Sequence, residues 1–258
     1  MIWITGDKHG DFKSIYWFCE DNECMMSKED YIIILGDFGG IWNYKGVTKE
    51  EEEELDKLEN LPCSILFIDG NHENHKRLNA YPVEEWHGGN VHKIRPHVIH
   101  LMRGQVFEIG GKKFATIGGA PSHDIQHGVL DPAKYEDDAA LKQAEIDLCN
   151  KHGGYQYTLY RIKDRDWWAE EVPSELEWRQ AFANFEVAGH IDFILSHEAP
   201  ANVVRRVSIF KPTDMSLRLT KLAEFIDYNF GIWYFGHYHI DGDFGEYRCA
   251  YRSIRRIA

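Results

Sequence analysis

The sequence predicts an α/β fold built around parallel strands. Short apolar runs alternate with helix-forming stretches over the first 80 residues, and this β-α-β order implies a parallel sheet with right-handed crossovers. The run Tyr31 to Leu35 is apolar throughout, which is typical of a strand buried on both faces. Five apolar runs of the chain also end in small clusters of Asp, Asn and His, the place where open α/β sheets bind their ligands.

The N-terminal elements are expected in the order strand, helix, strand, helix, strand. The apolar residues Phe12, Ile15 and Cys19 share one face of a helix predicted over 12–22. The second helix should begin after Thr48, because Thr48 with Glu51 three residues later resembles a capping box, and it should end near Asn60. The three strands between and around these helices are predicted at residues 2–5, 31–35 and 64–69.

The pattern changes after residue 98 to short strands and tight turns. Strands are predicted at 98–101, 105–109 and 113–117, the last two joined through Gly110-Gly111. Residues 121–190 are charged and helical, and we expect them to form an inserted helical cap on a single domain of residues 1–258. Strand signals resume at 193–195 and 232–235 around a helix at 216–229, and one or two more strands follow within 247–257.

The charge balance limits the class of partner. The chain has 29 Lys and Arg against 42 Asp and Glu, which argues against a binder of long duplex nucleic acid but not against a small phosphoester held by a metal. No stretch approaches the ~20 apolar residues of a membrane span. The N-terminus lacks the basic and apolar regions of a signal peptide, and the five scattered cysteines indicate buried thiols in a reducing compartment. We therefore expect a cytoplasmic protein.

The five polar clusters together have the composition of a dinuclear metal site. Because each follows a predicted strand, their side chains are expected at one edge of the sheet region. Imidazole, carboxylate and amide ligands without thiolate suit Mn, Fe, Zn or Ni better than a closed structural zinc site. The clusters are Asp7-Lys8-His9, Gly36-Asp37, Gly70-Asn71-His72-Glu73, Ser196-His197 and Gly236-His237-Tyr238-His239.

In order and spacing, these clusters resemble the motif set of calcineurin-like metallophosphoesterases. The resemblance spans residues 7–239 and implies a four-layer α/β/β/α sandwich with two mixed sheets. It also implies two divalent metal ions, with manganese the first expectation and iron, zinc or nickel as alternatives. One ion would be held by Asp7, His9 and His239, the other by Asn71, His197 and His237, and Asp37 would bridge both.

The resemblance also implies a reaction. A hydroxide that bridges the two metals would attack phosphorus in line, and His72, which follows the ligand Asn71, would protonate the leaving oxygen as general acid. Glu73 is the candidate to orient His72 or raise its pKa. The glycines before the ligands, Gly36, Gly70 and Gly236, fit tight turns that allow close approach of the backbone.

Departures from the motif set narrow the subfamily. The sequence after Gly36-Asp37 is Phe38-Gly39-Gly40, without the Arg expected of Ser/Thr protein phosphatases and diadenosine tetraphosphate hydrolases. The lack of basic tracts counts against a double-strand-break nuclease of the same superfamily. The chain is more similar to small bacterial and phage phosphoesterases, on the segments Gly118 to Asp124 and Trp167 to Glu171.

Several residues outside the ligand set are candidates for substrate contact. Ser122, His123, Asp124 or His127 could reach the substrate or cap the next helix, and Arg205 and Arg206 could bind phosphate, although solvated surface is the favoured interpretation. The aromatic residues between Tyr155 and Trp168 could stack a nucleobase, but we expect them to pack the insertion onto the body.

The predicted function is therefore metal-dependent hydrolysis of a small phosphomonoester or phosphodiester, with nucleotides among the candidate substrates. Two alternatives remain open: a single-strand nuclease, and a scaffold of the same fold that has lost its metals. The sequence carries no signal for the oligomeric state.

Overall fold

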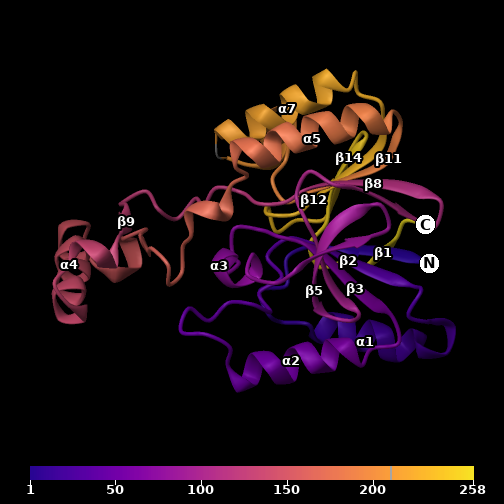
Figure 1. The fold of residues 1–258 in the computed structure, drawn as a ribbon. Coiled ribbons are helices and arrows are strands. Elements are labelled where there is room, and N and C mark those ends of the chain that lie inside the picture. The colour runs from indigo at the N-terminus through magenta and orange to yellow at the C-terminus, as the bar shows by residue number, and fades with distance from the viewer. Residues whose placement is uncertain (210) are drawn as a thin grey trace.

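Two large mixed β-sheets form the centre of the computed structural model, which describes residues 1–209 and 211–258 (Figure 1). The first sheet has the strand order β15 (Arg255–Arg256), β1 (Ile2–Thr5), β2 (Tyr31–Leu35), β3 (Ser64–Ile68), β6 (Val98–Leu101), β5 (Gly89–Arg95), β4 (Val83–Trp86). The second has the order β13 (Gly242–Phe244), β14 (Tyr247–Cys249), β12 (Phe230–Phe235), β11 (Ile191–Ser196), β8 (Lys112–Ile117), β7 (Val106–Ile109).

Helices cover the outer face of each sheet, which gives the predicted four-layer α/β/β/α sandwich. On the first sheet lie α1 (Lys13–Asn22) and α2 (Lys49–Glu59), and on the second lie α5 (Glu175–Ala188), α6 (Ala201–Val207) and α7 (Asp214–Phe225). Between the sheets, apolar side chains such as Leu66 and Leu195 are fully buried. Burying a side chain of this size contributes about 1.5–3 kcal/mol, so each of the three apolar layers stabilises the stack.

The parallel strands align their carboxyl ends, as the sequence predicts. In the first sheet Ile4 pairs with Ile33, and Ile33 with Leu66; in the second, Leu195 pairs with Tyr234. The polar clusters that follow these strands are therefore brought to one side of the sandwich. The capping box of Thr48 and Glu51 at the start of α2 is also confirmed.

One hairpin has no counterpart among the predicted elements, and one predicted helix has different ends. The hairpin is formed by β4, which is largely exposed, and β5, and its turn is made by His87 and Gly88, both with positive φ. The helix predicted at 216–229 is α7, which begins earlier, after its cap Thr213, and ends at Phe225. The remaining short elements of the body are η1 (Glu23–Met25), α3 (His75–Leu78) and η4 (Ala169–Glu171).

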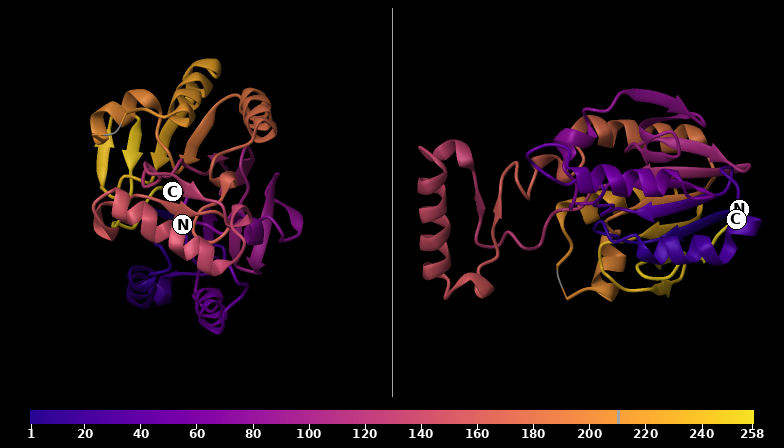
Figure 2. Two further views of the ribbon diagram at one scale, coloured as in Figure 1. Left: turned by 90° about the vertical axis from the view of Figure 1, so that its left-hand side faces the viewer. Right: turned by 90° about the horizontal axis from the view of Figure 1, so that it is seen from below.

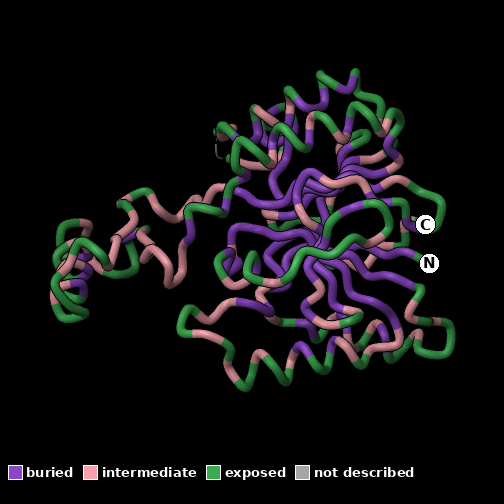
Figure 3. The backbone as a smooth tube through the Cα atoms, in the orientation of Figure 1, coloured by how far each residue is buried: buried purple, intermediate pink, exposed green. Residues whose placement is uncertain are grey.

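The range 121–190 divides into two parts in the structure. Residues 122–168, here named the arm, project from the body, while α5 packs on the second sheet through Trp178, Ala181 and Phe185 (Figures 1 and 2). The arm is mostly exposed or half-buried (Figure 3). It contains β9 (Val129–Leu130), η2 (Pro132–Lys134), α4 (Asp138–Lys151), η3 (Tyr155–Tyr157) and β10 (Arg161–Ile162).

The arm meets the body near its base. The buried Trp168 ring lies 5.5 Å from that of Trp42, and Asp164 Oδ2 lies 2.8 Å from Lys76 Nζ. Packing onto the body is thus confirmed for Trp168. It is wrong for Tyr155 and Tyr157, which are more than half exposed on the arm.

The five cysteines are all free thiols. Four are buried as expected, whereas Cys24 is exposed. Among the described residues, no helix has both the length and the apolar character needed to cross a membrane.

Candidate metal centre

The polar clusters after β1, β2, β3, β11 and β12 converge on one site. All seven predicted ligands belong to one chain of short contacts, which runs from Asp7 on the first sheet to His237 on the second. We call this group the candidate metal centre: Asp7, His9, Asp37, Asn71, His197, His237 and His239.

One half of the centre gathers His9, His239 and the two aspartates. His239 Nε2 lies 3.1 Å from Asp7 Oδ2 and 3.2 Å from His9 Nε2, and His9 Nε2 lies 3.6 Å from Asp37 Oδ2. One ligand atom of each of these four residues lies within 4.8 Å of the others, a spacing that suits a single metal ion.

The other half lies on the opposite oxygen of Asp37. His197 Nε2 is 3.3 Å from Asp37 Oδ1 and 3.3 Å from Asn71 Oδ1, and the His237 ring centroid is 4.9 Å from that of His197. The two carboxylate oxygens of Asp37 therefore face two different ligand sets.

The residues fit a pair of divalent cations. His237 Nε2 is buried without a hydrogen-bond partner, a state that costs free energy unless a ligand compensates it. His197 Nδ1 donates to the Leu35 carbonyl at 2.7 Å, which directs Nε2 toward Asp37 and Asn71, the side on which a metal would replace the Nε2 proton. Carboxylate, amide and imidazole donors without thiolate are the set that Mn, Fe, Zn and Ni accept.

The backbone of the candidate metal centre has φ angles that are unusual for non-glycine residues. Four of the seven candidate ligands have left-handed φ angles: His9 at 47°, Asp37 at 47°, His239 at 51° and His237 at 67°. Non-glycine residues adopt this region rarely, and such conformations cluster at functional sites.

Glycines beside the ligands make room for ligand side chains. A Cβ on Gly70 would lie 2.1 Å from Asp37 Oδ1, and one on Gly36 would lie 2.2 Å from His197 Nδ1. The close approach expected for these turns is therefore made by ligand side chains.

Charges within the centre favour an ionised Asp37 and a protonated His197. Burial opposes ionisation of Asp37, but the charge of His197 and its hydrogen bond hold the pKa of that carboxyl well below its usual range. Burial likewise opposes protonation of His197, yet Asp37 raises its pKa to about 10. Burial and the neighbouring His197 charge lower the pKa of His237 well below its usual value. The ionised Asp37 carboxylate thus lies among imidazoles. A bound metal cation would take over the role of the imidazolium charge in balancing this carboxylate.

His72 lies at the rim of the centre. Its backbone N–H donates to Asp37 Oδ1 at 2.8 Å, and its half-buried ring lies 5.1 Å from the His9 ring. Burial lowers its pKa, Asp37 opposes that shift, and the guanidinium of Arg161 adds to it. The His72 ring also lines the pocket that contains Asp37, Asn71, His237 and His239.

Glu73 does not orient His72, contrary to expectation. Its buried carboxylate accepts hydrogen bonds from the backbone N–H groups of Phe38 (2.6 Å) and Gly39 (3.3 Å). Glu73 therefore holds the loop that carries Asp37. Local sequence pattern could not predict this contact, because it joins residues 35 positions apart.

The start of the arm reaches the centre through three of the four predicted residues. Ser122 Oγ accepts a hydrogen bond from Asn71 Nδ2 at 3.3 Å, and both Ser122 Oγ and its backbone N–H bind the Glu171 carboxylate. His123 and Asp124 line a pocket of about 160 Å³ with the ligands Asp37, Asn71, His237 and His239.

Other residues singled out in the sequence lie elsewhere. The ring of His127 lies 3.9 Å from that of His152 within the arm, and α4 is capped by Asp137, so the helix-capping alternative for residues 122–127 is wrong. Arg205 and Arg206 are exposed on α6. Arg161, which sequence reasoning missed, binds Asp124 Oδ2 through Nε at 3.0 Å.

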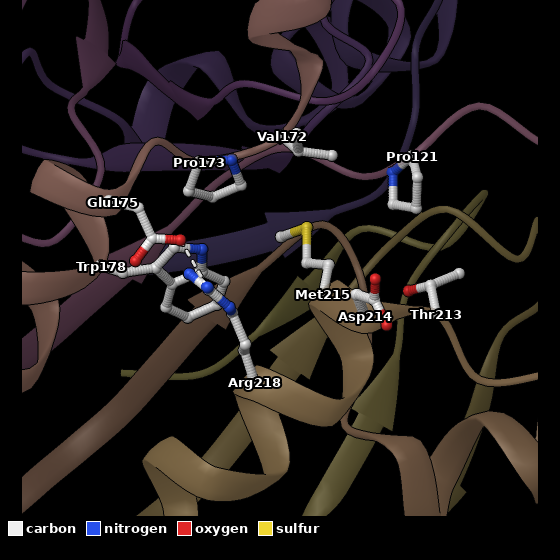
Figure 4. Close-up of a pocket in the computed structure, with 9 residues that line it drawn as sticks. All are labelled: Pro121, Val172, Pro173, Glu175, Trp178, Thr213, Asp214, Met215 and Arg218. Carbon is white, nitrogen blue, oxygen red and sulfur yellow. Dashed lines mark hydrogen bonds and ion pairs between the residues drawn. The ribbon is translucent and has the colours of Figure 1, made fainter.

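A second hollow adjoins the first, and a third lies at the base of the arm. The second, of about 150 Å³, is lined by His9, Gly39, Trp42 and His72. The third, of about 400 Å³, lies between α7 and the two points where the arm leaves and rejoins the body, Pro121 and Val172-Pro173 (Figure 4). Met215 and Trp178 give it apolar walls, and Arg218 pairs with Glu175 at its edge (Figure 4). None of the candidate ligands lines this third hollow.

Comparisons with known proteins agree with the motif pattern. The family model described as calcineurin-like phosphoesterase matches residues 1–241. A lariat debranching enzyme from Schizosaccharomyces pombe is 26% identical over 129 residues, which cover 46% of this chain and 25% of that protein. The chain thus spans about a quarter of the length of this curated relative.

Two solved structures resemble the chain at low identity. The phosphopantetheinyl hydrolase of Mycobacterium tuberculosis is 13% identical with a TM-score of 0.42, over 97% of this chain and 87% of that one. A candidate 5′-nucleotidase from Staphylococcus aureus, in complex with alpha-ketoglutarate, is 13% identical with a TM-score of 0.43, over 97% of this chain and 48% of that one. Likenesses at this level carry no conclusion about activity.

Proposed function

This chain belongs to the calcineurin-like phosphoesterase family, and we propose that it hydrolyses a small phosphomonoester or phosphodiester with two divalent metal ions. Asp7, His9 and His239 would hold one ion, Asn71, His197 and His237 the other, and Asp37 would bridge them. Manganese is the first ion to test, with iron, zinc and nickel as alternatives. Two ions bound there supply an attacking hydroxide and polarise the phosphoryl oxygens.

One observation carries the proposal. The two oxygens of Asp37 face two separate ligand sets, with His9 at 3.6 Å on one side and His197 at 3.3 Å on the other. A carboxylate in this position would hold both cations of a two-metal site, which would polarise the phosphoryl oxygens of a substrate. His237 Nε2, in the second ligand set, is buried without a hydrogen-bond partner, and coordination of a metal ion would satisfy it.

The remaining residues would position the substrate and move a proton. His72 adjoins the centre and would donate a proton to the leaving oxygen, since a departing alkoxide is a poor leaving group without one. Ser122 would fix the amide of Asn71 through the 3.3 Å hydrogen bond, so that the amide oxygen is presented to the metal. His123 and Asp124 line the same pocket and would contact the substrate.

The proposal is tested by metal content and turnover of the Asp37→Ala variant. We expect the purified wild-type protein to bind about two equivalents of Mn²⁺ and to hydrolyse p-nitrophenyl phosphate or bis-p-nitrophenyl phosphate, with turnover lost on chelation. Asp37→Ala should lose both metals and all turnover, because the bridge serves each ion. Asp11→Ala, which removes an exposed carboxylate on the neighbouring loop, is the matched control and should keep both.

Each contrary result has a distinct meaning. Full metal occupancy in Asp37→Ala would contradict the bridging role. Wild-type protein without metal or turnover would favour the scaffold alternative, whereas chelation-sensitive cleavage of single-stranded DNA or RNA in preference to both small esters would favour the nuclease.

A further inference from the structure

Two hollows meet at His72. The first contains the candidate ligands Asp37, Asn71, His237 and His239, so the phosphoryl group of a substrate would lie there. The second is lined by His9, Gly39, Trp42 and His72. Because the imidazole of His72 borders both, a leaving group that takes its proton from His72 must extend from the first hollow into the second.

The second hollow has the size and chemistry of a site for one flat ring. Its volume is about 150 Å³, and a cavity of about that volume holds benzene in another protein. None of its lining residues is Asp, Glu, Lys or Arg, so it offers no fixed charge to an anionic group. One of its walls is Trp42, and aromatic side chains pair favourably with other aromatic rings in offset-stacked or edge-to-face arrangements.

Several contacts hold the Trp42 side chain in place. The Trp42 ring packs edge-on against the buried Trp168 at 5.5 Å, with 75° between the planes, and lies 5.8 Å from the His72 ring. The backbone N–H of Trp42 donates to Glu51 Oε1 at 2.8 Å. A ring that is already fixed loses little conformational freedom when a ligand stacks on it, so it binds at lower entropic cost.

Gly39 also lines the second hollow. It has a φ of +73°, and a Cβ there would lie 2.4 Å from Gly10 N. A Cβ at this position would point at the backbone of the loop that carries His9, so glycine lets the two loops that line the hollow lie against each other.

We propose that Trp42 forms a leaving-group site that selects esters whose departing group carries a flat, uncharged ring, an aryl group or a nucleobase. This inference rests on the proposed function, since it assumes that the phosphoryl group binds at the candidate metal centre. It goes beyond that function by assigning the second hollow and by predicting that substrate preference is set on the leaving-group side.

The test compares two esters that differ in the shape of the leaving group. Phenyl phosphate carries a ring, and 2,2,2-trifluoroethyl phosphate carries a small aliphatic group; the corresponding methyl diesters replace them if diesters are the better substrates. We expect Trp42→Ala to lower kcat/KM for the phenyl ester by roughly 10- to 100-fold more than for the trifluoroethyl ester, the range given by loss of one stacked ring. Trp42→Phe should retain most of the preference. Trp17→Ala, which removes an exposed tryptophan on α1, is the matched control.

A second readout requires neither metal nor turnover. Saturation-transfer NMR with adenosine on the metal-free protein should show ring contacts in wild type, Trp17→Ala and Asp37→Ala, and weaker contacts in Trp42→Ala. Equal losses on both esters, or an adenosine signal unchanged by Trp42→Ala, would overturn the inference. Neither result would touch the proposed function, which the Asp37→Ala variant tests separately through metal content and turnover.

Discussion

A buried polar cluster lies beside the partly exposed candidate metal centre at the end of β3, and the two differ in how their charges are satisfied. Asn71, a member of the candidate metal centre, follows Asp69 by two residues, and the centre borders two hollows. The buried cluster, here named the Asp69 cluster, is closed and lines neither of these hollows. Its members come from β3, α3, β5, β6 and the turn after β6: Asp69, His75, His92, His100 and Arg103.

The Asp69 cluster contains its own cation. Arg103 Nε donates to Asp69 Oδ2 at 2.8 Å, and the same guanidinium donates to the Glu170 carbonyl at the base of the arm. His100 Nε2 lies 3.2 Å from Asp69 Oδ1, and His100 Nδ1 lies 3.1 Å from His92 Nδ1. Burial opposes ionisation of Asp69, but the charge of Arg103 holds its pKa well below the usual range.

The difference shows what separates a structural cluster from a ligand site in this fold. Both have a buried aspartate among histidines, but only the Asp69 cluster is balanced by an arginine. A buried imidazole nitrogen without a hydrogen-bond partner occurs in both clusters, at His237 and at His75. The candidate metal centre has no Lys or Arg among its members and holds four residues in left-handed conformations. Such a cluster is costly unless a ligand supplies positive charge.

The largest expected effect comes from His72. We expect His72→Ala to keep both metals and the wild-type stability but to lose roughly 10²–10⁴-fold in rate on esters with poor leaving groups, because proton donation to the leaving oxygen is removed. Activated esters, which need no proton, should lose much less. The measurement is kcat on phenyl and 4-nitrophenyl esters together with metal content. Equal losses on the two esters would contradict the proton-donor role.

The next effect distinguishes the two clusters by stability. Arg103→Ala should lower the free energy of unfolding by about 3–5 kcal/mol, because it removes the guanidinium charge that balances the buried Asp69 carboxylate. Urea unfolding of the metal-free proteins measures this loss. The matched control is Arg95→Ala, whose carboxylate partners Glu52 and Asp56 are exposed and whose cost should be about 1 kcal/mol or less. A small loss for Arg103→Ala would show that the Asp69 cluster is not held by its internal cation.

The sequence predicted the ligand site better than the structural cluster, for a physical reason. Each ligand motif directly follows an apolar strand, and parallel strands bring their carboxyl ends to one edge, so local pattern alone placed Asp7, Asp37 and His197 together. Nothing local places His92 beside His100 or Arg103 beside Asp69. Those contacts depend on the register of the β4–β5–β6 region, where the hairpin itself was missed.

The arm shows the same limit. Its helical and charged composition indicated an insertion, but the burial of Trp168 against Trp42 and the pairing of Arg161 with Asp124 join residues 126 and 37 positions apart. Tyr155, Tyr157 and Trp168 could not be separated from composition, although only Trp168 packs on the body. Ser122 could be predicted as a candidate because it follows a predicted strand, within a segment that resembles one of small bacterial and phage phosphoesterases.

The smallest effect tests the Asp69 cluster through pH. Burial lowers the pKa of His92 to about 4, and the neighbouring His100 adds to this shift while Asp69 opposes it. Between pH 6.5 and 4 the unfolded chain therefore binds one more proton at this residue than the folded protein, so stability should fall as the pH falls through this window. The slope is about 1.4 kcal/mol per pH unit for one such histidine.

His92→Asn should remove the contribution of His92 to the pH dependence of the free energy of unfolding. Urea unfolding of the metal-free protein across pH 4–8 measures this contribution. Above pH 7 the variant and wild type should run parallel, because His92 is neutral in both folded and unfolded chains. An unchanged slope below pH 6.5 would mean that His92 is not kept neutral by the cluster, and the contrast between a closed structural cluster and an open ligand site would lose one of its supports.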